Sequence, residues 1–489
     1  MNRRTFLEKS TGLASGMVLA SSCNADRPET AAVGTAGAET AARNVVMIVV
    51  DDQGLDAGCY GNPVIQTPHL DRLARDGTRF DYAFCTTASC SASRSVILSG
   101  LYNHANGQFG HMHDFHNFHT HAWVESLPVL LRRAGYRTAR VGKYHVQPAS
   151  VYAFDTRLEG NQGGQRNPIT MANLARDWLA QDREQPFFLY FCTSDPHRSG
   201  AFLEDQAHRP NAFGNEGTYE GVETITYDPA DVIVPPFLPD TPACRAELAQ
   251  YYQAVSRVDQ GLGTLIEALK ALGYYDDTLI LYLSDNGIAF PGAKTTLYDP
   301  GMRLPCIVRN PYLEQQGGVT DAMITWADLT PTILDFTGAA SPEGDDLHGR
   351  SFLSVLDQRQ AQGWDEVYAS HTFHEVTMYY PMRVVRTRRH KLLFNIAHGL
   401  PYPFATDLYA APTWRSLVDN GGTHYGKRSV ENYVHRPRFE LYDLDADPDE
   451  VQNLADHSEQ APLFAELQDK LKAFQERTDD PWLLKWTYE

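Results

Sequence analysis

The stretch Asn44-Val45-Val46-Met47-Ile48-Val49-Val50 decides the fold of this chain of 489 residues. The run is apolar throughout after Asn44, which predicts a strand buried on both faces, as the strands of parallel sheets are. It ends abruptly in Asp51-Asp52. Ligands of open α/β sheets bind beyond the carboxyl ends of the strands, so these two aspartates stand where a functional site is expected.

Further segments repeat the pattern of the first strand. Buried strands are predicted over 138–141, 186–192 and 278–283, and helical patterns lie between them, including a long one over about 245–272. Thr67 caps a predicted helix that has Pro68 in its first turn and ends at Gly77. This alternation predicts an α/β fold with a mostly parallel central sheet flanked by helices.

The character of the chain changes near residue 363. Hairpin-type strands are predicted over 382–386 and 391–395, and a terminal helix near 462–478. We therefore predict a catalytic domain over 43–362 and a smaller C-terminal α+β domain with its own small sheet over 363–489.

Composition excludes some classes of function. The chain is 43% apolar and can bury a large core, and its formal net charge is −19. So acidic a protein is not expected to bind nucleic acid, and any site for an anion must be positive locally. The seven cysteines are scattered without a C-x-x-C pair, which suggests neither a disulfide framework nor a zinc site.

The N-terminus predicts export. Arg3-Arg4-Thr5-Phe6-Leu7 is a twin-arginine pattern, and the apolar stretch over 12–20 is too short to span a bilayer. We expect an export signal over 1–23 and a disordered linker over 24–42. Cys23 is a candidate for lipidation, with ordinary cleavage nearby as the alternative. The expected location is the periplasm or the cell surface. A lipid anchor at Cys23 would be the only contact with a membrane.

A second informative stretch is Cys90-Ser91-Ala92-Ser93-Arg94, which leads into an apolar segment. A helix that starts near Ser93 would direct its free N–H groups and its positive end toward Cys90, which favours an anion there. For an isolated cysteine the alternative is a buried structural residue at a helix start.

Polar groups follow three of the predicted strands, as Asp51-Asp52, Asp195-Pro196-His197 and Asp285-Asn286-Gly287. Because these strands are predicted to be parallel, we expect the groups to converge at one edge of the sheet. Carboxylates and an amide oxygen suit a hard cation, Ca²⁺ or Mg²⁺. For any single pair, the alternative is a helix cap or a turn.

The residues from Cys90 to Gly100 resemble the sulfatase signature C-x-(P/A)-S-R-x-x-x-L-(T/S)-G. Other stretches resemble further motifs of that family, in the family's order along the chain. They are Asp51-Asp52, Thr67-Pro68-His69-Leu70-Asp71-Arg72-Leu73-Ala74, Gly142-Lys143-Tyr144-His145, Pro196-His197, Ser284-Asp285-Asn286-Gly287, Lys294–Tyr298 with Gly301–Pro305, and Leu441–Leu444 with Asp447-Pro448 and Asn453–Ala455. The chain is thus similar to the formylglycine-dependent sulfatases over nearly its whole length after the linker.

The resemblance implies an alkaline-phosphatase-like fold and a formylglycine made from Cys90, whose hydrate attacks sulfur. It implies one Ca²⁺ held by Asp51, Asp52, Asp285, Asn286 and an oxygen of residue 90. Asp285 would accept the hydrate proton and Arg94 would fix the hydrate. Lys143 and Lys294 would clamp the sulfate. His197, helped by Lys294, would protonate the leaving group, and His145 would take the proton of the second hydroxyl. Taken alone, each of these cations would be a surface charge and each histidine a turn or core residue.

Several stretches resemble the heparan N-sulfatase (sulfamidase) branch of the family. They are Asn106–Gly110, Ser126–Leu131, Tyr227–Val232, Gln253–Leu262, His374–Met378 with Tyr380–Arg383, and Asp480–Trp482. The implied reaction removes N-linked sulfate from glucosamine residues of heparan-type saccharides. His374 and Glu375 are candidates to touch the sugar, with packing as the alternative. The chain departs from the family at Ala92, where Pro is commoner, and at Ser199, where a cysteine of a pair is expected.

Three other functions stay open from the sequence. One is an O-sulfatase that acts on another sulfated polysaccharide. A second is a phosphodiesterase of the same superfamily, which would normally use two metals and a Thr or Ser nucleophile that the Cys90 motif does not supply. An unmodified Cys90 would leave a glycan-binding protein without turnover. The expected partners are a sulfated saccharide and a formylglycine-generating maturation enzyme, with a homodimer left open.

Overall fold

The computed structural model describes residues 43–182, 184–198, 212–344 and 347–488. The predicted export signal over 1–23 with Cys23, the linker over 24–42, and Ser199 lie outside the described residues. No helix in the described part of the chain is both long and apolar enough to cross a membrane.

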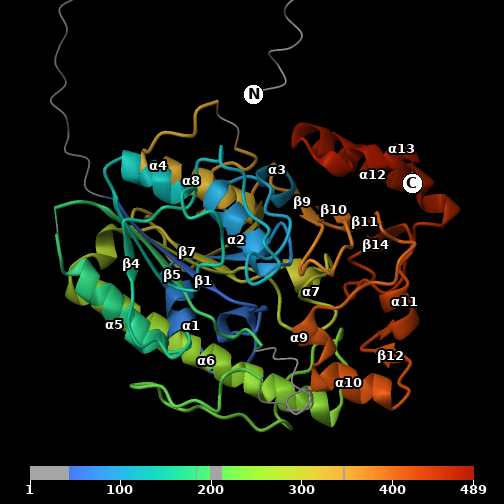
Figure 1. Ribbon diagram of the computed structural model, residues 1–489, viewed down its shortest axis with the longest axis horizontal. Coiled ribbons are helices and arrows are strands. Elements are labelled where there is room, and N and C mark those ends of the chain that lie inside the picture. Colours follow the sequence, from blue (N-terminus) through green and yellow to red (C-terminus); the bar gives the residue numbers. More distant parts are fainter. Residues whose placement is uncertain (1–42, 183, 199–211, 345–346, 489) are drawn as a thin grey trace, which may run out of the picture. The chain divides into compact units, whose positions relative to one another are not determined.

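The central sheet has eight strands in the order β4-β3-β5-β1-β6-β7-β2-β8 (Figure 1). Their bounds are β1 Asn44–Val50, β2 Thr78–Phe84, β3 Arg137–Gly142, β4 Thr156–Leu158, β5 Phe187–Cys192, β6 Thr278–Ser284, β7 Cys306–Arg309 and β8 Gly318–Thr325. Only β7 runs antiparallel to its neighbours among these eight strands. The predicted mostly parallel sheet is confirmed.

Strand β1 lies at the centre of this sheet and pairs in parallel with β5 and β6. All seven of its residues are buried. Val45, Met47 and Val49 belong to one hydrophobic cluster, and the alternating residues Val46, Ile48 and Val50 belong to the other. Side chains alternate between the faces of a strand, so both faces of the sheet are covered.

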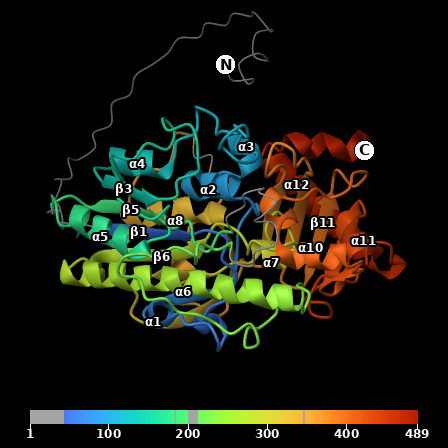
Figure 2. The same cartoon turned by 60° about the horizontal axis from the view of Figure 1, so that its bottom comes forward.

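Helices cover the two faces, as Figures 1 and 2 both show. On one face lie α2 Cys90–Ser99, α4 Leu127–Arg133 and α8 Leu329–Thr337, and on the other α1 Pro68–Arg75, α5 Pro168–Leu179 and α6 Pro242–Ala271. One of these helices starts earlier than the sequence predicted, and another starts as predicted but is capped differently. Helix α6 begins at Pro242, because Thr241 caps it by accepting the Cys244 N–H. Thr67 makes no side-chain cap bond to α1, since Asp259 of α6 accepts the N–H groups there instead.

The second sheet is antiparallel, in the order β14-β11-β10-β9. Its strands are β9 Glu366–His371, β10 Met382–Thr387, β11 His390–Asn395 and β14 Phe439–Asp443, and α12 Ala461–Arg477 packs beside it (Figure 1). Leu471 and Phe474 of α12 share a hydrophobic cluster with Val384 of β10. The predicted smaller C-terminal sheet is therefore present; the predicted boundary at residue 363 precedes β9 and stays a prediction.

The remaining elements are short. They are α3 Asn103–Asn106, α7 Asp299–Met302, α9 Thr406–Tyr409, α10 Pro412–Asp419, α11 Val430–Val434, α13 Lys485–Tyr488 and the paired strands β12 His424–Tyr425 and β13 Arg428–Ser429. Single turns of 3₁₀-helix occur at Gly58–Tyr60, Tyr275–Asp277, Trp326–Asp328, Leu353–Val355, Ser458–Gln460 and Pro481–Leu484.

Candidate active site

Four neighbouring parallel strands bring most of the predicted site residues to one edge of the central sheet. Asp51 and Asp52 follow β1, and Asp285 and Asn286 follow β6. Lys143 and His145 follow β3, and His197 follows β5 a few residues later. The order β3-β5-β1-β6 places the carboxyl ends of these strands side by side, as the sequence predicted.

Helix α2 brings Cys90 to the same edge. The helix begins at Cys90 itself, not near Ser93 as predicted, and all ten of its residues are buried. Ser93 is not available to cap the helix, because its hydroxyl donates to the backbone carbonyl of Asp285 at 2.5 Å. Cys90 is thus the first residue of the helix, among the N–H groups that have no partner inside it, at its positive end.

Oxygen atoms surround the Cys90 sulfur. The ligand atoms of Asp51, Asp52, Cys90 and Asp285 all lie within 4.8 Å of one another. Cys90 Sγ is 3.6 Å from Asp52 Oδ1 and 3.5 Å from the Asn286 side-chain nitrogen. Asp52 has a backbone φ of 63°, a left-handed conformation that costs energy in a residue other than glycine. We call the four oxygen-bearing residues around Cys90, namely Asp51, Asp52, Asp285 and Asn286, the oxygen cluster.

Two oxygens of the oxygen cluster are buried without a hydrogen-bond partner in the described part of the chain. They are Asp51 Oδ1 and Asn286 Oδ1. A buried polar atom without a partner is costly, so such atoms point to a missing ligand. Carboxylate and amide oxygens are the ligands that Ca²⁺ and Mg²⁺ prefer. The residues present therefore fit a hard divalent cation.

Three cations neutralise most of this negative charge. Arg94 Nε lies 2.8 Å from Asp285 Oδ2, and Lys143 forms an ion pair with Asp51. Lys294 Nζ lies 2.9 Å from both Asp52 and Asp407 and 3.2 Å from His197 Nε2. Four carboxylates thus face three cations, and the group carries one negative charge. A divalent cation makes it positive by one, as an anion site in an acidic protein requires.

Burial shifts the pKa values of the site. It raises the pKa of the Cys90 thiol well above its usual value, so the thiol stays protonated near neutral pH. Burial, together with the charge of Asp51, also raises the pKa of Asp285, to about 6. Burial and the positive charge of nearby lysines hold the pKa values of His145 and His197 well below the usual range. Both imidazoles are therefore neutral in the free protein.

His145 lies beside the oxygen cluster rather than within it. Its backbone φ is 58°, again left-handed, and its Nε2 is 2.7 Å from His113 Nδ1. Its Nδ1 is buried and has no hydrogen-bond partner in the described part of the chain. The other predicted residues contact one another directly.

Asp195 corrects one expectation, because its carboxylate does not join the oxygen cluster. It forms ion pairs with Arg166 and, at 2.6 Å, with Arg257. Arg166 also donates to the backbone carbonyl of His197 at 2.9 Å. Asp195 therefore holds the segment that carries His197, and its oxygens are not free for a metal.

Sequence reasoning missed Asp407, His111 and His113. Asp407 lies in α9, where no motif marks it, whereas the H-x-H spacing of His111 and His113 was a signal available in the sequence. His374, a predicted candidate, is buried and bonded at 2.9 Å to Ser89, next to Cys90. Glu375 instead accepts from the backbone and hydroxyl of Thr406 and so packs against α9.

The sequence matches two family models. Residues 43–339 match the model described as Sulfatase, and residues 292–402 match the model described as N-sulphoglucosamine sulphohydrolase, C-terminal. The chain is 40% identical to human N-sulphoglucosamine sulphohydrolase over 460 residues, which cover 90% of this chain and 91% of that protein. It is 26% identical to N-acetylglucosamine-6-O-sulfatase of Bacteroides thetaiotaomicron, over 90% of this chain and 88% of that one.

Solved structures share the fold at low sequence identity. A protein in complex with its substrate D-glucosamine-2-N,6-O-disulfate superposes with a TM-score of 0.65 at 21% identity, over 90% of this chain and 99% of that one. The phosphonate monoester hydrolase of Agrobacterium radiobacter gives a TM-score of 0.64 at 19% identity, over 89% and 96%. These likenesses confirm the predicted fold class.

Proposed function

The chain belongs to the sulfatase family, and we propose that it hydrolyses the N-linked sulfate of glucosamine residues in heparan-type saccharides. The observation that carries the proposal is Cys90, which starts a buried helix and is surrounded by the oxygen cluster, in a chain 40% identical to a human N-sulphoglucosamine sulphohydrolase. A sulfated glucosamine is also the substrate named for the Bacteroides thetaiotaomicron relative and for the solved structure with a bound disulfate.

The environment of Cys90 supports its conversion to formylglycine. Sulfatases generally use formylglycine and a divalent metal. A thiol that is fully buried beside carboxylates, with its pKa raised, is a poor nucleophile. As an aldehyde hydrate, residue 90 would present a hydroxyl to sulfur at the positive end of α2. Arg94, fixed by Asp285, would hold that hydroxyl in place.

Asp51, Asp52, Asp285 and Asn286 would hold one Ca²⁺, with an oxygen of residue 90 as a further ligand. A cation held there would polarise the sulfuryl group and offset the charge on its oxygens. The unpartnered oxygens of Asp51 and Asn286 support this ligand set. Asp285, whose pKa is raised to about 6, is suited to accept the proton of the attacking hydroxyl.

Lysines and histidines of the site would complete the reaction. Lys143 and Lys294 reach the oxygen cluster from two sides and would clamp sulfate oxygens. His197, 3.2 Å from Lys294, would protonate the leaving nitrogen. The negative charge of a bound sulfate favours the protonated form of His197, which its surroundings disfavour in the free protein. His145, neutral and with a free ring nitrogen, would accept the proton of the second hydroxyl.

The test is a panel of glucosamine N-, 3-O- and 6-O-sulfates and unrelated sulfated sugars, read by release of free sulfate. We expect N-sulfoglucosamine to be cleaved best. An amine leaves poorly unless it is protonated, so His197→Ala should reduce sulfamate cleavage more than cleavage of an activated aryl sulfate. Good cleavage of an O-sulfated sugar with N-sulfoglucosamine untouched would replace the sulfamidase proposal by an O-sulfatase. Mass spectrometry of the Cys90 peptide tests the aldehyde separately.

We also propose that the protein is exported, to the periplasm or to a lipid anchor at Cys23, because of the twin-arginine pattern near its start. Twin-arginine export moves folded proteins, so a maturation enzyme would act on Cys90 before export. Cell fractionation of the full chain and of Cys23→Ser is the test. A lipid anchor predicts release of the variant from the membrane fraction, and signal cleavage without lipidation predicts no difference.

A further inference from the structure

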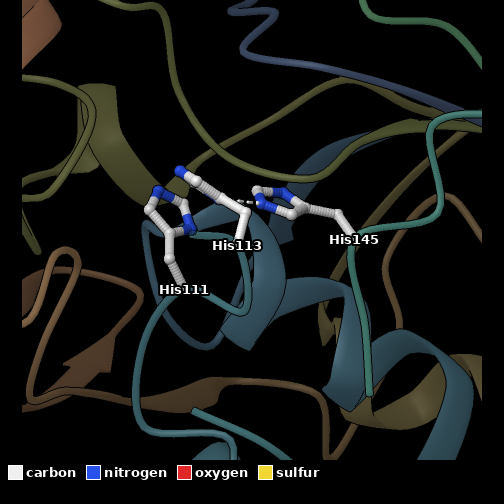
Figure 3. Close-up of side chains that lie close together, drawn as sticks. All are labelled: His111, His113 and His145. Carbon is white, nitrogen blue, oxygen red and sulfur yellow. Dashed lines mark hydrogen bonds between the residues drawn. The ribbon is translucent and has the colours of Figure 1, made fainter. Parts of the chain in front are cut away.

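Three histidines gather beside the oxygen cluster, and no step of the proposed reaction uses two of them. His111 and His113 lie in the segment between α3 and α4, and His145 follows β3. His111 is buried and His113 is exposed. Figure 3 shows the three rings side by side, with the side chains of His113 and His145 directed toward each other. We call them the three-histidine cluster.

The ring nitrogens of this cluster are close together. One nitrogen from each residue lies within 4.8 Å of the others, and His113 Nδ1 is 2.7 Å from His145 Nε2. The rings of His111 and His113 each lie with their centres 4.9 Å from that of His145. The buried Nδ1 of His145 has no hydrogen-bond partner in the described part of the chain.

We propose that the three-histidine cluster is a second metal site, which takes a divalent cation of the zinc class, and that an ion bound there inhibits the enzyme by occupying His145. The site is separate in its chemistry from the oxygen cluster, because imidazole suits Zn²⁺ and Cu²⁺ whereas carboxylates and amides suit Ca²⁺. The two sites would therefore sort their cations by ligand type.

The geometry requires little movement to accept zinc. Zinc binds imidazole nitrogen at about 2.0–2.1 Å, which places two tetrahedral ligands about 3.4 Å apart. The nitrogens of His113 and His145 must then separate by less than about 1 Å, and His113 can move because it is exposed. Three protein ligands with an open fourth position form a common zinc arrangement.

The surroundings of His111 would orient it as a ligand. Its Nδ1 is 3.4 Å from the Ser91 hydroxyl, and its Nε2 is 2.8 Å from His374 Nε2. One ring nitrogen of His111 must face the ion, so one of these two partners is displaced and the other fixes the ring. Burial and neighbouring positive groups also lower the pKa values of all three histidines, so zinc need not displace protons near neutral pH.

Inhibition is the part of this inference that rests on the proposed function, because it assumes that His145 accepts a proton on Nδ1, its unpartnered ring nitrogen. An ion bound to Nε2, the nitrogen that faces His113, leaves the proton of the neutral ring on Nδ1, so that nitrogen has no lone pair with which to accept a second proton. Binding itself does not depend on the reaction. The experiment therefore measures binding and turnover independently.

The experiment uses the full chain with saturating Ca²⁺ and compares the wild type with His113→Ala and His119→Ala. His119 is a matched control, since it is an exposed histidine of the same segment outside the cluster. Zn²⁺ binding is followed by calorimetry, and Co²⁺ is used as a spectroscopic probe for tetrahedral nitrogen ligands. His113 has no role in the proposed reaction, so His113→Ala should keep its activity in zinc-free buffer.

We expect the wild type and His119→Ala to bind one Zn²⁺ and to lose turnover as the site fills. His113→Ala should bind zinc at least about tenfold more weakly and resist inhibition. Equal zinc affinity in His113→Ala and the wild type would overturn the site. Binding at His113 without loss of turnover would overturn the inhibition and leave the site standing. If no sulfated substrate is cleaved, the proposed function fails, and the calorimetry and cobalt spectra still decide whether the cluster binds metal.

Discussion

Arg383 of β10, in the C-terminal sheet, forms a buried ion pair with Asp480 in which every polar atom has a partner, whereas around Cys90 some buried polar atoms have none among the described residues. Arg383 donates to both Asp480 oxygens and to two backbone carbonyls. Asp480 also accepts from Gln475 and from the Trp482 N–H. Around Cys90, Asp51 Oδ1 and Asn286 Oδ1 have no hydrogen-bond partner in the described part of the chain.

The difference separates a structural use of buried charge from a functional one. A closed pair such as Arg383 and Asp480 needs nothing more, so its removal should damage folding. The group around Cys90 has one carboxylate more than it has cationic side chains. A bound divalent cation reverses this net charge, and the site can then attract an anion. The predictions below test this separation by changing one carboxylate at a time.

The largest effect is expected for Asp52→Asn in the oxygen cluster. Turnover should fall by about a thousandfold, since a ligand and a charge beside the reacting group are both lost. Bound Ca²⁺ should be lost as well. The thermal midpoint of the metal-free protein should stay close to that of the wild type, because the change relieves repulsion among carboxylates and Lys294 keeps Asp407.

Sulfate release, elemental analysis and a melting curve measure these three quantities. Asp177→Asn, at an exposed aspartate, is the control and should alter none of them. Stoichiometric Ca²⁺ retained in an active Asp52→Asn protein would remove Asp52 from the ligand set.

Asp480→Asn should do the opposite, lowering stability while the folded molecules keep their turnover. It leaves Arg383 buried without its counter-charge, at a cost of about 3–5 kcal/mol. Asp445→Asn is the control, because Asp445 and Arg389 form an exposed pair whose loss should cost less than about 1 kcal/mol. A loss of turnover in Asp480→Asn without a loss of stability would contradict the comparison.

The pair also makes stability depend on pH. Burial by itself would raise the pKa of Asp480, but Arg383 outweighs burial and holds the pKa below its usual value of 3.8. The contribution of the pair is therefore complete above about pH 4 and is lost as the pH falls further. Urea unfolding over that range should show a smaller acid-induced loss in Asp480→Asn than in the wild type.

Asp407→Asn should have an intermediate effect, because Asp407 reaches the site through Lys294 and is not itself part of the oxygen cluster. It comes from α9 in the C-terminal part of the chain and lies 2.9 Å from Lys294. We treat it as a positioning residue and expect kcat to fall about tenfold to a hundredfold with a small change in KM. Asp407→Glu should restore part of kcat.

The pH profile distinguishes this role from a general structural one. Burial lowers the pKa of Lys294, and Asp407 and Asp52 more than compensate, so the net shift is upward. Removing the charge of Asp407 should lower the pKa of Lys294 and move the alkaline limb of the kcat profile to lower pH. A reduced kcat with an unmoved alkaline limb would assign Asp407 to packing alone.

The sequence was sufficient to predict the central strands and the position of the site residues that directly follow them. The apolar run over 44–50 and the motifs after β1, β3, β5 and β6 put Asp51, Lys143, His197 and Asp285 at one edge, because parallel strands end together. Contacts between distant segments could not be read in this way. Asp195 faces Arg257, and Asp407 reaches Lys294, because of how loops and helices pack around the sheet.

The same limit explains why α2 does not start near Ser93 and why the Thr67 side chain does not cap α1. Ser93 and Thr67 are good capping residues by type, yet both hydroxyls bond elsewhere in the fold. The prediction used the local preference of Ser and Thr for helix starts, but hydrogen bonds to other parts of the chain engage both hydroxyls.

The smallest effect is expected for Asp259→Asn, at a buried carboxylate that has neither a cation nor a metal. Asp259 of α6 accepts the N–H groups of His69 and Leu70 at 3.2 and 2.8 Å and so caps α1. Burial raises its pKa to about 7, although these two hydrogen bonds act against the rise. Because the pKa in the folded protein lies above the usual 3.8, the protonated form is favoured by folding, and stability falls as the pH rises from about 4 through about 7.

The asparagine of Asp259→Asn keeps one hydrogen-bond acceptor and cannot ionise. Below about pH 4 the variant should lie within about 1 kcal/mol of the wild type, and it should gain on the wild type as the pH rises to about 8. Urea unfolding of both proteins across this range measures the difference, from which all other titrating groups cancel. If stability changes equally with pH in both proteins, Asp259 ionises in the folded protein at no cost. Two backbone N–H groups would then stabilise a buried carboxylate as well as Arg383 stabilises Asp480.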